Sequence, residues 1–297
     1  MNEKTPPVCD YEGSDYQQTF WERGGRDYED AVEAIALRRL LPPGGKFMLE
    51  LGAGAGRNTN RYINFQRIAL VDYSRSQLVQ AQTHLGASES YVYVAADVYR
   101  LPFVDGRFDG ATMIRTLHHM AEPALALSQV YRVMAPEGVF ILEYANKRNL
   151  KSMMRYLMGK QDWNPFTRDP IEFVSLNFNF HPRAVSRDLK DLGFEIEKTL
   201  TVSHFRIDAL KRLIPLRVLV SLDALFQRTG GLVQFSPSVF VRSHVAGKDQ
   251  AAEGEALFQC PRCQADLPGM GKDLICDGCG SVWPFQDGIY DFRIKDD

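Results

Sequence analysis

The stretch FMLELGAGAGRNT, residues 47–59, decides the fold, because it leads an apolar run directly into a glycine-rich loop. Residues 47–51 have the composition of a buried strand. Gly52, Gly54 and Gly56 then permit positive φ angles and let a ligand approach the backbone without a Cβ atom in the way. Such a loop at the carboxyl end of a first parallel strand holds nucleotide-like cofactors. The G-x-G-x-G spacing, with Glu50 two positions earlier, favours a cofactor with an amino-acid end over a dinucleotide.

Three further apolar runs end in polar residues in the order that a parallel sheet requires. Run 68–71 ends at Asp72, where an acidic side chain at the tip of the second strand meets ribose hydroxyls. Run 91–96 ends at Asp97, and run 108–114 leads into Arg115. Helical segments are expected at 27–41, 123–134 and 181–192, and this alternation is typical of parallel strands with right-handed crossovers. Strands at 194–202 and 238–243 fit an antiparallel pair that completes the sheet.

These four strand ends resemble the motifs of class I S-adenosylmethionine (SAM) methyltransferases. The segments Leu117-His118-His119 and YRVMAPEG, residues 131–138, are similar to the ubiquinone/menaquinone-type branch of that family. The resemblance is close over residues 45–145 and loose over 180–245. It implies an α/β fold with a seven-stranded Rossmann-like sheet, mostly parallel with the last strand antiparallel, and SAM as the cofactor.

The resemblance also implies a set of cofactor contacts. In the family, an acidic residue at the position of Asp97 accepts from the adenine amino group, and the next backbone N–H holds a ring nitrogen. The expected contacts are Glu50, Gly52, Ala53, Gly54, Gly56, Asp72, Tyr73, Asp97, Val98 and Arg115.

The expected methyl-transfer site contains two candidate bases and a candidate lid. His118 and His119 are candidate general bases, because imidazole titrates near working pH, although a structural role before a helix suits them equally well. In many relatives the N-terminal segment folds over the cofactor, which makes Tyr16, Trp21 and Tyr28 candidate lid residues. Packing against the sheet edge explains these aromatic residues about as well.

A second motif consists of four cysteines near the C-terminus. Cys260 and Cys263 form one C-x2-C pair, and Cys276 and Cys279 form another. Four thiolates favour a tetrahedral structural Zn²⁺ without an open position for substrate. The segment is too short for a core of its own, so metal binding would supply most of its folding free energy. A rubredoxin-like iron site is the alternative, and Cys9 stands apart from both pairs.

The tail from Val282 to Phe292 resembles, together with the cysteines, a small zinc-ribbon family. That family includes the activator subunit of eukaryotic tRNA and release-factor methyltransferases. Trp283 stands where the family usually has tyrosine. Because the activator covers apolar surface on its methyltransferase, the resemblance implies a stabilising ribbon carried in cis. A simple C-terminal cap is the alternative.

Length, charge and hydropathy set the organisation of the chain. A net charge of −2 over 297 residues argues against a protein whose whole surface binds nucleic acid. No apolar signal core or membrane-spanning run is visible, so the cytoplasm is the expected compartment. The predicted parts are an N-terminal helical lid at 1–45, a methyltransferase domain at 46–245, a linker at 246–256 and a zinc ribbon at 257–297. Two insertions, 146–180 and 205–236, interrupt the methyltransferase domain.

The region 146–245 contains sixteen Lys or Arg residues against nine Asp or Glu residues. Its second insertion reads as a basic amphipathic helix, which suits a lid over an apolar or anionic acceptor, or contact with a membrane surface. A helix that covers a sheet edge is the plainer alternative.

Three functions follow from these motifs. The first is methyl transfer to a small-molecule or lipid-like acceptor. The second is methylation of rRNA or tRNA, with the ribbon and the basic insertion as docking modules, although the ribbon is nearly neutral. The third is a non-catalytic SAM-binding scaffold. The sequence does not indicate whether the acceptor atom is oxygen, carbon or nitrogen, or which oligomeric state the protein adopts.

Overall fold

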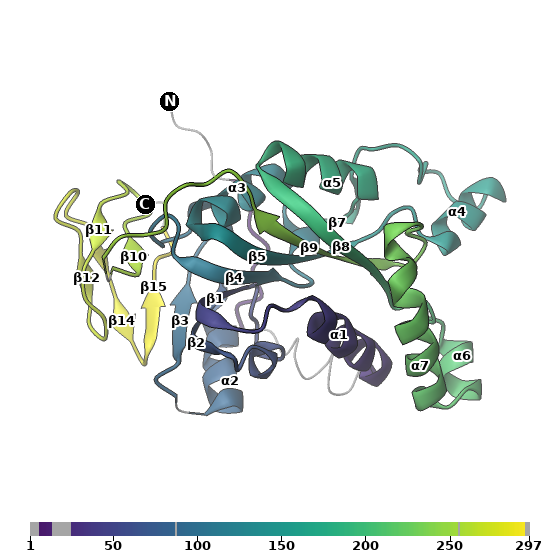
Figure 1. Ribbon diagram of the computed structural model, residues 1–297, viewed down its shortest axis with the longest axis horizontal. Helices are drawn as coiled ribbons and strands as arrows, with labels where there is room; N and C mark the ends of the chain where they lie inside the picture. Colours follow the sequence, from purple (N-terminus) through teal and green to yellow (C-terminus); the bar gives the residue numbers. More distant parts are fainter. Residues whose placement is uncertain (1–5, 14–24, 87, 255, 295–297) are drawn as a thin grey trace.

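A computed structural model describes residues 6–13, 25–86, 88–254 and 256–294. Its central feature is a nine-stranded sheet with the strand order β14-β15-β3-β2-β1-β4-β5-β9-β8 (Figure 1). Strand β9 is antiparallel to both of its neighbours, whereas β3, β2, β1, β4 and β5 are mutually parallel. The predicted seven-stranded methyltransferase sheet is confirmed in its seven strands: β1 (Gly45–Leu51), β2 (Phe65–Asp72), β3 (Tyr91–Ala95), β4 (Phe108–Met113), β5 (Met134–Ala145), β8 (Phe194–Val202) and β9 (Ser238–Val245).

Helices cover both faces of this sheet. Figure 1 shows α3 and α5 on one face and α1 and α2 on the other. Helix α3 begins with Pro123, and proline fits this position because an N–H in the first turn has no acceptor within the helix. The helix buries one stripe of apolar side chains that includes Leu127 and Val130. Helix α2 is capped by Ser74, whose side chain accepts from the Gln77 amide. The bounds are α1 (Asp27–Leu40), α2 (Arg75–Leu85), α3 (Pro123–Val133) and α5 (Pro182–Asp191).

The helices of the two insertions lie at the end of the molecule opposite the ribbon in Figure 1. The first contains α4 (Leu150–Leu157), β6 (Ile171–Val174) and β7 (Asn177–Asn179). The second contains α6 (Asp208–Leu213), α7 (Leu216–Phe226) and a 3-10 turn, η5 (Gln227–Gly231). Helix α7 packs on α1 through the buried Leu219. Within the described residues, every helix is too short or too polar to cross a bilayer.

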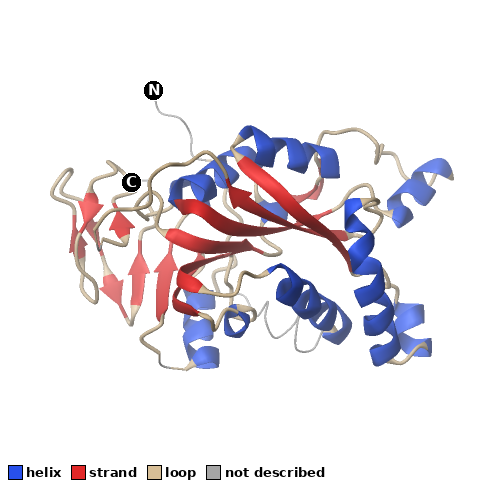
Figure 2. Cartoon of the chain, viewed as in Figure 1, coloured by secondary structure: helices blue, strands red, loops and turns tan. Residues whose placement is uncertain are grey.

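The ribbon extends the main sheet, a strand pairing that the sequence did not indicate. Its short strands are β10 (Phe258–Gln259), β11 (Asp266–Leu267), β12 (Leu274–Ile275), β13 (Val282–Trp283), β14 (Phe285–Gln286) and β15 (Ile289–Asp291). Strand β15 pairs in parallel with β3, so the sheet runs unbroken into the ribbon, as Figure 2 shows in red. Successive residues of β15 point to opposite faces, so Ile289 and Tyr290 are buried in different core clusters.

The connection after β3 leaves part of the sheet for the ribbon to cover. Between β3 and β4 the chain forms only a 3-10 turn, η3 (Val98–Arg100), and no covering helix. Phe258 of the ribbon fills this position, with ring centroids 5.7 Å from Phe103, 4.6 Å from Tyr290 and 5.1 Å from Phe292. The strand pairing and the aromatic cluster together cover an edge that would otherwise be open for pairing with another chain.

The predicted linker at 246–256 is held against the methyltransferase part. Lys248 Nζ donates to the carbonyl oxygens of Arg132 and Met134 at 2.7 and 2.8 Å. The Ala252 amide donates to the carbonyl oxygen of Gly106 at 3.0 Å. These bonds join the segment to the loop before β4 and to the start of β5.

Candidate functional site

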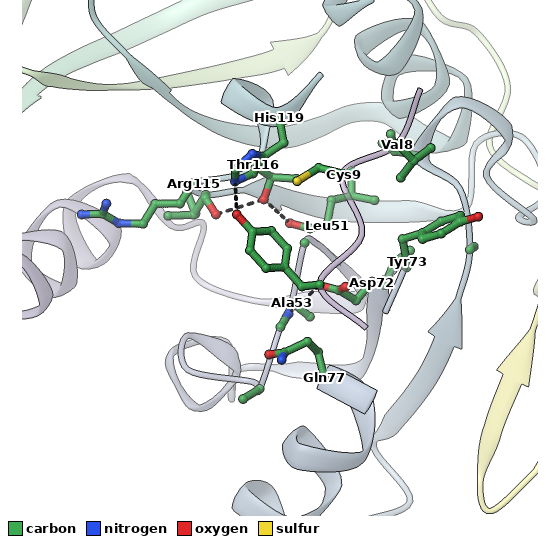
Figure 3. Close-up of a pocket in the computed structure, with 18 of the residues that line it drawn as sticks. Val8, Cys9, Leu51, Ala53, Asp72, Tyr73, Gln77, Arg115, Thr116 and His119 are labelled. Atoms are coloured by element: carbon green, nitrogen blue, oxygen red, sulfur yellow. Dashed lines mark hydrogen bonds between the residues drawn. The ribbon is translucent and has the colours of Figure 1, made fainter. Parts of the chain in front are cut away.

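The carboxyl ends of β1, β2, β3 and β4 meet at one cleft (Figure 3). Topology places them there, because parallel strands end at the same edge of a sheet. Among the residues predicted as cofactor contacts or bases, the cleft is lined by Gly52, Ala53, Gly54, Asp72, Tyr73, Val98, Arg115 and His119.

The glycine loop lies on the floor of the cleft. Gly52 has φ 67°, and a Cβ atom there would lie 2.1 Å from Thr116 Oγ1, so only glycine fits. The amides of Gly52 and Ala53 both donate to the Val71 carbonyl oxygen, at 2.9 and 3.0 Å. These bonds fix the loop from β1 against the end of β2.

Asp72 connects the loop to the second strand. Its carboxylate accepts from the Gly54 amide and from the Ser74 amide, each at 2.9 Å. Burial raises the pKa of Asp72 to about 6, while the two amide bonds act in the opposite direction. At neutral pH the group is therefore a carboxylate with acceptor positions left for hydroxyl groups of a ligand.

Two predicted contacts lie beneath the loop instead of in the cleft. Glu50 is buried and accepts from Thr59 Oγ1 at 2.6 Å. Burial raises the pKa of Glu50 to about 7. Gly56 faces Leu85, which would be 2.8 Å from an added Cβ atom. Both residues support the loop from below.

Asp97 lies in an adjoining hollow, together with Tyr73, Asp10 and Arg100. Its carboxylate accepts from the Tyr99 amide at 2.9 Å. Burial raises the pKa of Asp97. Val8 and Tyr73 border both this hollow and the main cleft, so the two adjoin each other beside the N-terminal segment.

Arg115 has an unusual backbone, with φ 55°. Its amide donates to Glu143 at 2.8 Å, and its guanidinium pairs with the buried Glu33 of α1. Burial favours protonation of Glu33, but the guanidinium groups of Arg115 and Arg57 hold its pKa below the ordinary value. This buried ion-pair network fixes α1 against the wall of the cleft.

His119 has a defined hydrogen-bonding arrangement. Its Nδ1 lies 3.1 Å from the carbonyl oxygen of Leu176, which can only accept, so Nδ1 carries the proton. Its Nε2 then accepts from the Tyr11 hydroxyl at 3.1 Å. Burial lowers the pKa of His119, so the ring is neutral at pH 7.

His118 lies behind His119, with ring centroids 3.9 Å apart, and does not line the cleft. Burial and the neighbouring His119 and Arg115 lower the pKa of His118 well below its ordinary value. Of the two predicted bases, only His119 therefore has access to the cleft.

The segment 6–13, called the strap here, lies within the predicted N-terminal lid, but the sequence did not indicate that its residues line the cleft. Val8, Cys9 and Tyr11 line the cleft, and Figure 3 shows Cys9 pointing toward Thr116 and His119. Glu12 accepts from the amides of residues 75 and 76 at the start of α2, where the helix dipole favours an anion. Such contacts join residues more than sixty positions apart, so no local pattern predicts them.

The predicted lid residues do not map onto the strap. Tyr16 and Trp21 lie outside the described residues. Tyr28 is 2% exposed and donates to Asp223 of α7 at 2.6 Å. The structure therefore places Tyr28 in the core between α1 and α7, away from the cleft, because its hydroxyl needs a buried partner.

The four cysteine sulfurs converge within 4.8 Å of one another. Both turns use the same backbone pattern: Gln264 and Gly280, each with positive φ, donate to the first cysteine of their pair. A tetrahedral zinc with Zn–S bonds of about 2.3 Å requires sulfurs roughly 3.8 Å apart. Cys260 and Cys279 are separated by 3.7 Å, so the cysteines fit a zinc ion.

Comparisons with known proteins agree with this geometry. A family model described as a methyltransferase domain matches residues 49–142. Demethylmenaquinone methyltransferase from Chlamydia trachomatis is 37% identical over 165 residues, which cover 54% of this chain and 70% of the relative. The chain belongs to the SAM-dependent methyltransferases.

Other matches to this SAM-dependent methyltransferase are partial or distant. An uncharacterized 37.1 kDa protein in transposon TN4556 of Streptomyces fradiae is 26% identical over 199 residues, 62% of this chain, and the match spans only 53% of that relative. A solved chain from the complex of the Haloferax volcanii Trm112 methyltransferase activator with a methyltransferase has a TM-score of 0.55 at 17% identity. It covers 78% of this chain and 96% of that chain, and it supports the fold alone.

Proposed function

We propose that this SAM-dependent methyltransferase transfers a methyl group to a small, lipid-like acceptor. The observation that carries the proposal is the cleft in which the glycine loop, Asp72 and His119 meet, with His119 Nδ1 3.1 Å from the Leu176 carbonyl oxygen of the first insertion. The relatives that include demethylmenaquinone methyltransferase favour an acceptor of this class.

On the cofactor side, each group has a distinct task. The glycine loop gives the amino-acid end of SAM close access to the backbone. With SAM bound, Asp72 would accept hydrogen bonds from the ribose hydroxyls, and the apolar Ala96 and Val98 would contact the adenine. Asp97, in the adjoining hollow, would accept from the adenine amino group. SAM supplies a methyl group on a sulfonium, which is already a strong electrophile.

On the acceptor side, His119 is the candidate base. With SAM bound, the acceptor atom would form a bond to the methyl carbon while the carbon–sulfur bond breaks and its electron pair stays on sulfur. If the acceptor carries a proton, His119 Nε2 takes it, directly or through the Tyr11 hydroxyl that bonds to it. The Leu176 carbonyl stabilises the imidazolium that forms, because it accepts from Nδ1.

We also propose that the ribbon binds one structural Zn²⁺ through Cys260, Cys263, Cys276 and Cys279. The matching turn geometry of the two cysteine pairs supports this assignment. The role of the ribbon is then that of a built-in activator, because β15 and Phe258 cover the β3 edge in cis.

The test follows labelled methyl from SAM into separated fractions of lipids, small molecules, RNA and protein from a cell extract. The wild-type chain is compared with Asp72→Ala, which removes the carboxylate at the end of β2. We expect label in the organic-soluble lipid fraction with the wild-type chain alone. Label confined to RNA would instead support the RNA alternative, and no transfer to any fraction despite SAM binding would support the scaffold alternative.

A further inference from the structure

The two insertions carry an apolar and basic surface that the methyl-transfer cleft does not use. We propose that this insertion surface, formed by α4, α7 and the segment 232–235, docks on an anionic lipid bilayer. The docking itself does not depend on the proposed function, whereas the delivery of a lipid acceptor from the bilayer does.

Exposed apolar side chains concentrate in these insertions. Within the described residues, seventeen of the twenty-three exposed large apolar side chains lie in 146–180 or 205–236. On α4, Leu150, Met154 and Leu157 are spaced i, i+4 and i+7, and they are 55%, 51% and 76% exposed. This spacing places them on one side of the helix.

Helix α7 repeats the arrangement. Val218, Leu222 and Leu225 follow the same spacing and are exposed, while Leu219 on the other side packs into the core. Just beyond the helix, Leu232 is 91% exposed. Packing of α7 over a core or a sheet edge accounts for the buried Leu219, but it does not account for the exposed apolar side chains on the other side of the helix.

The two insertions are joined at their bases. The Leu150 amide donates to the Phe235 carbonyl oxygen at 2.8 Å. Asn146 Nδ2 donates to the carbonyl oxygens of Gln234 and Ser236 at 2.9 and 2.8 Å. Figure 1 shows α4 and α7 at the same end of the molecule, opposite the ribbon. The two apolar stripes therefore belong to one end of the protein.

Basic side chains accompany the apolar stripes. Among the basic residues of the insertions, Lys211 forms an ion pair within the protein, because its Nζ lies 2.6 Å from the carboxylate of the buried Glu29. The exposed acidic residues of the insertions are Asp162, Asp169, Glu172 and Asp208. Seven exposed basic residues of the insertions form no ion pair with any other described residue: Lys151, Arg155, Lys160, Arg168, Arg212, Arg217 and Arg228.

This combination favours a bilayer over the other occupants. Short helices with apolar stripes and lysine or arginine at their borders lie in the plane of a membrane interface, where anionic headgroups attract the basic groups. A second copy of the chain would bring two basic surfaces together, which repel each other. RNA would neutralise the basic groups but would leave the leucine and methionine side chains in water.

Docking would place the acceptor side of the cleft near the bilayer. The first insertion reaches the cleft directly, because its Leu176 carbonyl oxygen lies 3.1 Å from His119 Nδ1. On the proposed function, a lipid-like acceptor would then pass from the bilayer along the insertions without crossing bulk water.

The test is co-sedimentation of the zinc-replete full chain with vesicles of phosphatidylcholine, with or without phosphatidylglycerol. The apolar variant Leu157→Gln/Leu225→Gln is compared with the matched control Ile275→Gln/Val282→Gln, which changes two residues of the ribbon that are 64% and 55% exposed. We expect the partition coefficient to fall by about tenfold or more in the apolar variant and to stay unchanged in the control.

A charge variant, Lys151→Gln/Arg217→Gln, tests the electrostatic part. We expect its binding to mixed vesicles to fall about thirtyfold and to lose the preference for phosphatidylglycerol. Circular dichroism and SAM binding, which involve other residues, verify that each variant is folded.

Equal binding of all variants, or wild-type binding that ignores phosphatidylglycerol, would overturn the proposal. So would a wild-type dimer in light scattering that the apolar variant converts to monomer, or RNA binding that the insertion variants abolish while vesicle binding is absent. None of these readouts requires methyl transfer, so failure of the acceptor assignment is distinguishable from failure of docking.

Discussion

Replacing Phe258 by alanine should destabilise the methyltransferase part together with the ribbon. The Phe258 side chain is fully buried and contacts Phe103 of the loop after β3 as well as Tyr290 and Phe292 of the ribbon. Truncation of a buried phenylalanine lowers the free energy of unfolding by about 3–5 kcal/mol. Because Phe103 lies in the main core cluster, this loss should lower the free energy of unfolding of the whole sheet.

The assay is equilibrium unfolding in denaturant with zinc present, followed by circular dichroism and by release of zinc to a chromogenic chelator. We expect both probes to give one coincident transition, with the midpoint lowered in Phe258→Ala. The matched control is Phe173→Ala, which removes the same atoms from a side chain that is 56% exposed and should change stability by less than about 0.5 kcal/mol. The reasoning fails if the two variants are equally stable, or if zinc release shifts while the dichroism transition stays in place.

Three other changes test the site. Asp72→Asn should weaken SAM binding by about tenfold or more. In the wild type, the affinity for SAM should fall as the pH is lowered through about 6, because the Asp72 carboxylate takes up a proton there. Calorimetry should show that the affinity of the variant depends less on pH. Cys276→Ser should lower the zinc content below one ion per chain, measured by atomic emission, and retention of stoichiometric zinc would contradict the four-thiolate site. His119→Gln should lower kcat by about a hundredfold with little change in the Kd of SAM, whereas His118→Gln, outside the cleft, should change kcat less; equal effects of the two would point to a structural role.

The strands of the fold were predictable because their signal is local. The run that ends at Asp72 was expected at 68–71 and occupies β2 (Phe65–Asp72), and the late strand at 194–202 matches β8 (Phe194–Val202). Apolar runs bounded by glycine, proline and aspartate define such strands without any knowledge of the partner strand. The alternating helices followed from the same local pattern.

The residue contacts of the strap and the pairing of β15 with β3 were not predictable because they depend on distant partners. Tyr11 reaches His119 across 108 positions, and nothing near either residue indicates the contact. The tail was expected to be a zinc ribbon that stabilises the methyltransferase part in cis or caps its C-terminus, but its cysteines carry no information about the strand with which it pairs. Tyr28 was misplaced for a related reason: its partner, Asp223, is 195 positions away.

The pairing of β15 with β3 has a consequence for how the protein matures in the cell. The two strands are separated by almost two hundred positions, so closing this loop is entropically expensive and slow. During synthesis, β3 is made long before β15. Until β15 is available, the backbone N–H and C=O groups on one edge of β3 are unpaired and can pair with another chain, which promotes aggregation. Zinc bound early would preorganise the ribbon that contains β15 and shorten the time during which the β3 edge is unpaired. If the ribbon binds zinc as proposed, cells starved of zinc should therefore accumulate this protein in inclusion bodies, even if the catalytic cleft needs no metal.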